Sequence, residues 1–128
     1  MGAVNWLSEP QEHDYVAAAN YLTLVVGDEF VGAMVEGLRH AETVEREAKD
    51  ILRASRLPLL AIDDPHVASD LKKVRKRKAL SPILLVRGDA AAGRPLQIAD
   101  GYHRACASYL TDENTAIPCR IVDFSARG

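Results

Sequence analysis

The chain has few cysteines, few aromatic residues and no long hydrophobic run. Two of its 128 residues are cysteines, and aromatic residues make up 5%. Cys106 and Cys119 lack metal-ligand spacing, which argues against a zinc site and predicts two reduced thiols in the core. No apolar stretch is long enough to cross a bilayer, and no basic start followed by an apolar segment marks export. We therefore expect a cytoplasmic protein that does not enter a membrane.

The chain does have the composition of a globular domain. Hydrophobic residues make up 48% and charged residues 27%, which are ordinary proportions for a folded protein. A length of 128 residues lies within the single-domain range and can bury a core. No internal repeat or low-complexity linker divides the chain, so we expect residues 1–128 to form one domain.

Charges of opposite sign are unevenly distributed, although the formal net charge is only −2. Residues 1–50 hold ten acids and three bases, whereas residues 51–128 hold eight acids and thirteen bases. Six of the seven residues in the segment Lys72–Lys78 are cations. This segment favours a polyanion such as DNA or RNA, or it is a solvated helix end whose cations complement the helix dipole. The acidic first half is suited instead to a protein partner.

The spacing of apolar residues predicts both helices and strands. Helices are expected at residues 13–26, 28–40, 47–55 and 65–78, and strands at 57–62, 82–87 and 95–99. The first two helices should form a helical hairpin, and the last two of these strands a β-hairpin. Val67, Leu71 and Val74 share one face of the helix at 65–78, and we expect that face to pack on the sheet.

The most informative segment joins a strand to a helix in the second half of the chain. A predicted strand ends at Asp100, Gly101 permits a tight turn, and the first turn of the next helix carries His103 and Arg104. A helix N-terminus presents unpaired amides and partial positive charge, so an imidazole and a guanidinium there converge on one anion-sized spot. A phosphate group suits that spot, because a guanidinium can bind two of its oxygens at once.

The same residues resemble a known signature. Asp100-Gly101-Tyr102-His103-Arg104 is similar to the Gly-Gly-Cys-His-Arg of sulfiredoxins, the Asp-Gly-His-His-Arg of ADP-dependent free serine kinases and the Gly-Glu-Arg-Arg of ParB proteins. All belong to one ParB/sulfiredoxin superfamily. Leu57–Leu60, Ser81–Val86 and Ala116–Val122 resemble strands of that family in the same order. The resemblance implies an α+β fold over residues 57–124, with a small mixed sheet, packed helices and an N-terminal helical extension at residues 1–56.

The resemblance also implies a ligand. The chain would bind a nucleotide such as ATP, ADP or CTP, with Mg²⁺ as a companion ion held by Asp100. Asp100 and His103 would be the catalytic residues of a phosphotransferase or a nucleotide hydrolase. The nucleotide-binding residues would be Gly101, Tyr102, His103, Arg104 and His66.

One position departs from the family pattern. Tyr102 stands where sulfiredoxins place their reactive cysteine, and a phenol cannot form the sulfur linkage that their repair reaction needs. Sulfiredoxin activity is therefore not expected. A DNA-binding regulator that uses Lys72–Lys78 and a protein-interaction module remain alternatives to a nucleotide-binding protein.

Two features also have purely structural interpretations. Asp63 or Asp64 can cap the helix that follows them instead of contributing to a pocket. Arg104 can pair with Asp112 or Glu113 instead of binding phosphate. The sequence alone leaves both alternatives open.

Overall fold

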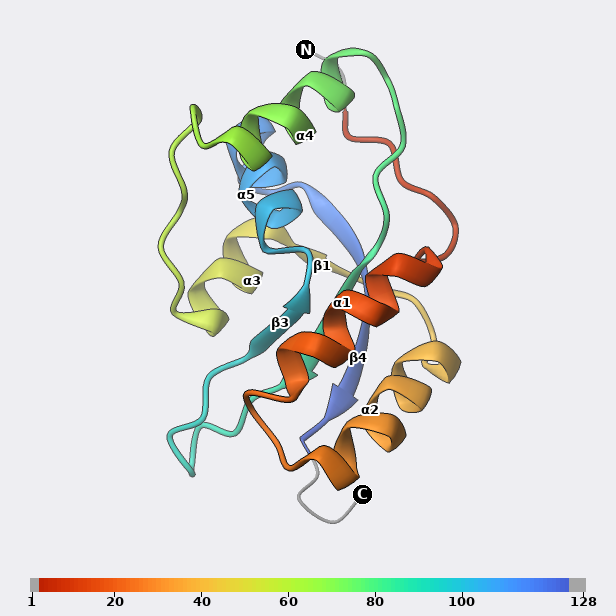
Figure 1. Cartoon of the computed structure of the whole chain (residues 1–128). Coiled ribbons are helices and arrows are strands. Elements are labelled where there is room, and N and C mark those ends of the chain that lie inside the picture. The colour runs from red at the N-terminus through yellow and green to blue at the C-terminus, as the bar shows by residue number, and fades with distance from the viewer. Residues whose placement is uncertain (1–2, 125–128) are drawn as a thin grey trace.

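The computed structural model describes residues 3–124, and this part of the chain contains both helices and strands (Figure 1). The elements in chain order are α1 (Glu12–Leu22), α2 (Asp28–His40), β1 (Val44–Glu47), α3 (Ala48–Ser55), α4 (Pro65–Arg75), β2 (Ile83–Arg87), β3 (Gln97–Asp100), α5 (Tyr102–Thr111) and β4 (Ala116–Asp123). The expected α+β class with a mixed sheet is confirmed. None of the described helices has the length and apolarity that a bilayer span needs.

The strands form one sheet in the order β1-β4-β2-β3. β4 pairs antiparallel with β1 and parallel with β2, and β2 pairs antiparallel with β3. The predicted hairpin of the second and third strands is therefore confirmed. β1 was not predicted. It lies within the first 56 residues, which were expected to be a helical extension, and it joins that part of the chain to the sheet.

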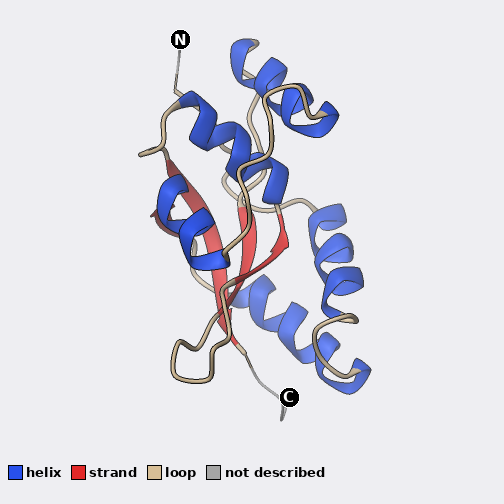
Figure 2. Cartoon of the chain, turned by 90° about the vertical axis from the view of Figure 1, so that its left-hand side faces the viewer, coloured by secondary structure: helices blue, strands red, loops and turns tan. Residues whose placement is uncertain are grey.

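Helices cover both faces of the sheet (Figure 2). Successive side chains of a strand point to opposite faces. In β2 the side chains on both faces are buried from Ile83 to Val86. Ile83 and Leu85 pack with residues of α3, α4 and α5, whereas Leu84 and Val86 pack with residues of α1 and α2. The sheet is thus the middle layer between two apolar clusters.

The predicted helical hairpin is confirmed, and a buried cation attaches it to the sheet. The guanidinium of Arg39 in α2 binds both carboxylate oxygens of Glu12 in α1, at 2.6 and 2.7 Å. Arg120 of β4 is buried, and its Nη1 donates to the Arg39 carbonyl oxygen at 2.6 Å and to the Tyr15 hydroxyl at 3.2 Å. α1 therefore has a fixed place against the sheet.

Two predicted helices end earlier than the sequence suggested. α1 ends at Leu22 instead of residue 26, because the amides of Leu24 and Val25 bond to carbonyls three residues back, which tightens the last turn. α4 ends at Arg75 instead of Lys78. Arg77 has a φ of 59°, and the Lys78 amide folds back onto the Lys73 carbonyl at 2.9 Å, which closes the helix.

The apolar face of α4 is buried as predicted, but its packing partner is different. Val67, Leu71 and Val74 are all buried. Their helix lies chiefly against α5 instead of directly on the sheet. α4 and α5 therefore run next to each other, which brings their N-terminal turns together.

The strand predicted at residues 57–62 is wrong. This segment forms no strand, and its side chains are accessible: Leu57 is 39%, Leu59 42% and Ile62 64% exposed. Leu60 is partly buried and packs against the cluster under α3, α4 and α5, but the segment pairs with no strand of the sheet. Cys106 and Cys119 are buried and free, as predicted.

Candidate functional site

The turn between β3 and α5 can be made only by a residue without a side chain. Gly101 has a φ of 113°, in the left-handed region that favours glycine. A Cβ on this residue would lie 2.3 Å from Cγ2 of Ile83 and 2.7 Å from its Cβ. The backbone at the start of α5 is consequently held against the first residue of β2.

The start of α5 has no side-chain cap. Gly101 occupies the N-cap position and has no group that could accept hydrogen bonds from the amides of Tyr102 to Arg104. The neighbouring helix α4 is different, because Asp64 accepts from the amides of His66 and Val67 at 2.9 and 3.1 Å. The sequence predicted a helix cap at either Asp63 or Asp64, and the structure shows that it is Asp64. The unpaired amides and the helix dipole of α5 favour an anion at its N-terminus.

A hollow of about 240 Å³ lies where α4 and α5 begin. His66 belongs to the first turn of α4 and His103 to the first turn of α5, and their ring centroids are 4.8 Å apart. The walls come from His66, Ser69, Asp70 and Lys73 of α4 and from the turn at Asp100–Arg104. Most of the predicted site residues therefore meet at one place.

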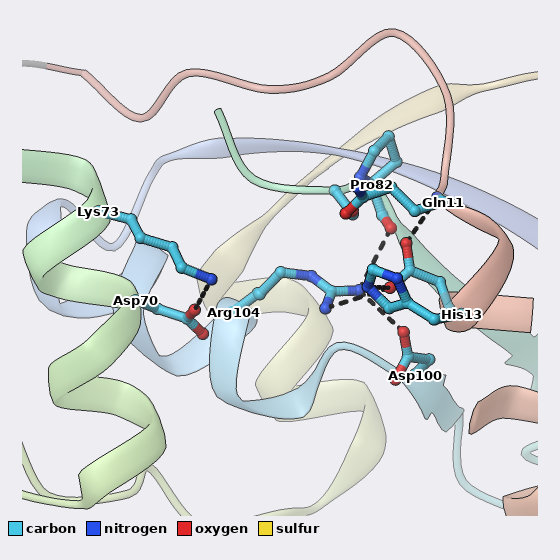
Figure 3. A network of polar contacts seen from close by, with 9 residues as sticks. Gln11, His13, Asp70, Lys73, Pro82, Asp100 and Arg104 are labelled. Atoms are coloured by element: carbon cyan, nitrogen blue, oxygen red, sulfur yellow. Dashed lines mark hydrogen bonds and ion pairs between the residues drawn. The ribbon is translucent and has the colours of Figure 1, made fainter. Parts of the chain in front are cut away.

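Arg104 is held by acidic and carbonyl oxygens. Its Nη2 donates to Oδ2 of Asp100 at 3.1 Å and to the carbonyl oxygen of Pro82 at 3.4 Å (Figure 3). Its Nη1 lies 3.7 Å from Oδ1 of Asp14. The expected alternative of a pair with Asp112 or Glu113 is wrong. The Nε of Arg104 is buried and has no hydrogen-bond partner among the described residues.

Asp14 is a member of this network that the sequence did not reveal. Its side chain is 2% exposed, and its Oδ2 accepts from the Gln11 amide at 2.7 Å. Three residues into α1, an aspartate is expected to cap its own helix, and Asp14 does so together with Gln11. Local sequence holds no signal for its second role beside Arg104.

Burial makes the acids around the hollow weaker than usual. Burial raises the pKa of Asp100, the Arg104 guanidinium opposes that rise, and the Asp14 carboxylate adds to it. Burial also raises the pKa of Asp70, with Lys73 opposing. Lys73 Nζ lies 4.0 Å from Asp70 Oδ1, on the α4 side of Arg104 (Figure 3). A carboxyl group with a raised pKa is better suited to accept a proton near neutral pH.

The charges around the hollow are nearly balanced. Lys73 and Arg104 supply two cations, and Asp14, Asp70 and Asp100 supply three acids. These five side chains carry a formal charge of −1 when all are ionised. A ring N–H of His66 or His103 can donate a hydrogen bond to an anion in the hollow.

Tyr102 lies beside the hollow instead of lining it. Its hydroxyl donates to the Pro58 carbonyl oxygen, and its ring centroid is 5.7 Å from that of His103. This bond attaches the exposed 57–62 segment to α5. Asp100 was expected to bind Mg²⁺. Among residues 3–124, however, no group of three His, Cys, Asp or Glu side chains lies close enough together to hold a metal ion.

Comparisons with known proteins give no further guide. No protein-family model, no curated protein and no solved structure matches the chain. The case for a function therefore depends on the geometry of the hollow and on the sequence signature at Asp100–Arg104.

Proposed function

We infer that the hollow between α4 and α5 binds the phosphate end of a nucleoside di- or triphosphate. The observation that carries this proposal is the meeting of two helix N-termini at which His66 and His103 lie 4.8 Å apart, beside Lys73 and the uncapped amides of α5. Backbone amides at a helix start, imidazoles and a lysine are the groups that bind phosphate oxygens. The sequence resemblance to ParB/sulfiredoxin domains at Asp100–Arg104 supports the same proposal, of which a fold of that family is a part.

The structure suggests how the work would be divided among these residues. Nη2 of Arg104 already donates to Asp100 and Pro82, and Nε is buried, so Nη1 and the charge of the group are what it can offer a phosphate. His66, His103, Lys73 and the amides of α5 would make most of the direct contacts. Pockets that bury a whole small molecule usually measure roughly 300–1,000 Å³, so the hollow would hold phosphate groups and leave the sugar and base outside.

The hollow also contains groups able to move a proton. Asp100 and His103 both line it, and the pKa of Asp100 is raised by burial. A phosphotransferase or nucleotide hydrolase activity would use these two side chains as base and acid. Mg²⁺, if bound, would have Asp100 as its protein ligand and phosphate oxygens as the others.

Calorimetric titration tests the proposal. ATP, ADP, CTP, GTP and inorganic phosphate are each titrated with and without Mg²⁺, first into the natural protein and then into Lys73→Ala. We expect at least one nucleotide to bind, and its affinity to fall about tenfold in Lys73→Ala, because a charge-assisted hydrogen bond is lost. Lys72→Ala is the matched control, since Lys72 is exposed on α4 and does not line the hollow.

Removal of the imidazoles gives a second test. If His66 and His103 donate hydrogen bonds to phosphate, nucleotide affinity should fall at least about tenfold in the His66→Gln, His103→Gln double variant. Arg104→Ala is less suitable, because it also leaves Asp14 buried without its cation. Absence of binding by every compound in the panel would overturn the proposal.

A second candidate function is nucleic-acid binding by Lys72–Lys78. All six basic side chains of this segment are exposed, three on the last turns of α4 and three just beyond its end. A phosphate backbone is attracted by such a cluster. The charge-reversal experiment described in the Discussion separates this function from nucleotide binding.

A further inference from the structure

A second and larger concavity, of about 490 Å³, lies at the opposite end of β3 from the phosphate hollow. It is bounded by α3, by the loop between β2 and β3, and by the carboxyl-terminal halves of the parallel strands β2 and β4. None of its lining residues lines the hollow between α4 and α5. Its volume falls within the range of roughly 300–1,000 Å³ found for small-molecule pockets.

The floor of this concavity is apolar. Ile51 of α3 and Leu85 of β2 form its buried base, and Leu96 and Ile121 are partly accessible beside them. The Leu96 amide donates to the Ala54 carbonyl oxygen at 3.1 Å, which fixes the entry to β3 against α3. The floor is therefore preformed and would bind the apolar body of a ligand without rearrangement.

The rim is rich in arginine. Five arginines from different elements line it: Arg46 of β1, Arg53 of α3, Arg56 just after α3, Arg87 of β2 and Arg94 of the β2–β3 loop. Asp50 and Asp89 are the carboxylates of the lining. Asp89 already accepts from the amides of Ala91 and Ala92, and Asp50 lies near Lys49 and Arg53.

Three of these arginines have no acidic partner among residues 3–124, and one of the three, Arg94, stacks on the ring of Phe124 at 4.0 Å. Arg46 donates only to the neighbouring Glu45 carbonyl oxygen, and Arg56 has no side-chain partner in that range. Arg56 also has a φ of 59°, a conformation that costs free energy for any residue with a Cβ. By contrast, Arg87 is paired with Asp123 at 2.8 Å. The free guanidinium groups supply positive charge above an apolar floor.

We propose that this concavity binds a small organic anion that has an apolar body and one carboxylate or sulfonate group. The apolar body would rest on Leu85, Leu96 and Ile121, and the anionic group would bind Arg46 and Arg56. Arginine suits this task because its planar fork binds two oxygens of a carboxylate together. The excess of cations over acids at the rim excludes a cationic ligand of the same shape.

Binding of anilinonaphthalene sulfonate tests the proposal, because this fluorescent probe joins an apolar ring system to one anionic group. We expect saturable binding to the folded protein and chemical-shift changes centred on the methyl groups of Leu85, Leu96 and Ile121. The Arg46→Gln, Arg56→Gln double variant should bind the probe about tenfold more weakly, because two charge-assisted contacts are lost. N-phenylnaphthylamine, which lacks the sulfonate, should bind both proteins equally.

Two further variants make the result decisive. Ala54→Phe, at an exposed position of the lining, should block the probe sterically while leaving every arginine in place. An Arg75→Gln, Lys76→Gln variant removes two exposed cations outside the concavity and should leave binding unchanged. The proposal is overturned if the probe does not bind, if the Arg46 and Arg56 variant binds it normally, or if the shifted methyl groups lie elsewhere.

Discussion

Arg104 joins residues that lie far apart in the chain. Asp14 reaches it from α1, Asp100 from the end of β3, and Pro82 from the residue before β2. Removing one partner of such a buried group leaves the others without compensation, which costs more than the pair contributes. Arg104 is therefore as much a structural centre as a candidate ligand, and its network positions the turn that carries His103.

At the same scale, Gly101→Ala should be among the most damaging small substitutions. The new methyl group would overlap Ile83, and φ of 113° would be strained, so the free energy of unfolding should fall by about 2–4 kcal/mol. Gly93→Ala is the matched control: its φ is 72°, but no atom lies within 4 Å of the added carbon, so about 1 kcal/mol should be lost. Urea titration measures both. Equal losses would show that the contact with Ile83 does not constrain the turn.

The sequence predicted some residues of the site better than others. His103 and Arg104 were predicted because they sit beside a glycine at a strand-to-helix turn, a local pattern. His66 was predicted by the order of elements in the resemblance. Asp14 and Lys73 were missed, because their local patterns are explained by a helix cap and a solvated helix face, and only packing brings them to the hollow.

Among the elements, β1 and the 57–62 segment show why local patterns misled. β1 has the sequence Val-Glu-Arg-Glu, in which only the valine favours a strand, yet it pairs with β4 from Val44↔Cys119 to Glu47↔Ala116. The apolar 57–62 segment has strand-like composition but no partner. Strand formation depends on an available neighbouring edge, which the sequence of a segment does not contain.

The cap of α4 gives a prediction at this scale. The amide of Val67, followed by that of His66, holds the pKa of Asp64 below its ordinary value of 3.8. A lowered pKa in the folded state stabilises the protein above pH 3.8, and this stabilisation disappears as the pH falls through the folded value. Asp64→Ala should thus lower the melting temperature at pH 7, and the difference should shrink in acid.

Asp63→Ala is the control for that experiment. Asp63 is exposed and accepts no side-chain hydrogen bond among residues 3–124. Its replacement should leave the melting temperature nearly unchanged at both pH values. If the two variants melted alike at pH 7, the cap at Asp64 would make no contribution to α4.

For the whole molecule, charge reversal can test whether the end of the basic segment acts independently of the hollow, which Lys73 of the same segment lines. Lys76, Arg77 and Lys78 are exposed beyond the end of α4, roughly 15 Å along the helix from His66. Exposed charges that far apart are largely screened at ordinary salt. Replacing all three with glutamate should leave the fold and nucleotide affinity intact and abolish any binding of duplex DNA.

Circular dichroism, calorimetry and fluorescence anisotropy at two salt concentrations measure these three properties. A DNA affinity that the reversal leaves unchanged would remove nucleic-acid binding from consideration at this segment. Loss of nucleotide binding in a folded variant would instead extend the nucleotide site to Lys76, Arg77 and Lys78.

β4 lies in the middle of the sheet although it follows the other three strands in the sequence. On the ribosome, a nascent chain that has released residues up to 115 has only the β2–β3 hairpin, and β1 still lacks a partner. The apolar face of α2 then lacks β4 against it, and exposed apolar surface of this kind is what chaperones bind. Nascent chains arrested with β4 inside the exit tunnel should therefore be digested by a protease that spares longer ones, since residues 116–123 must emerge before any of the sheet's long-range pairing can form.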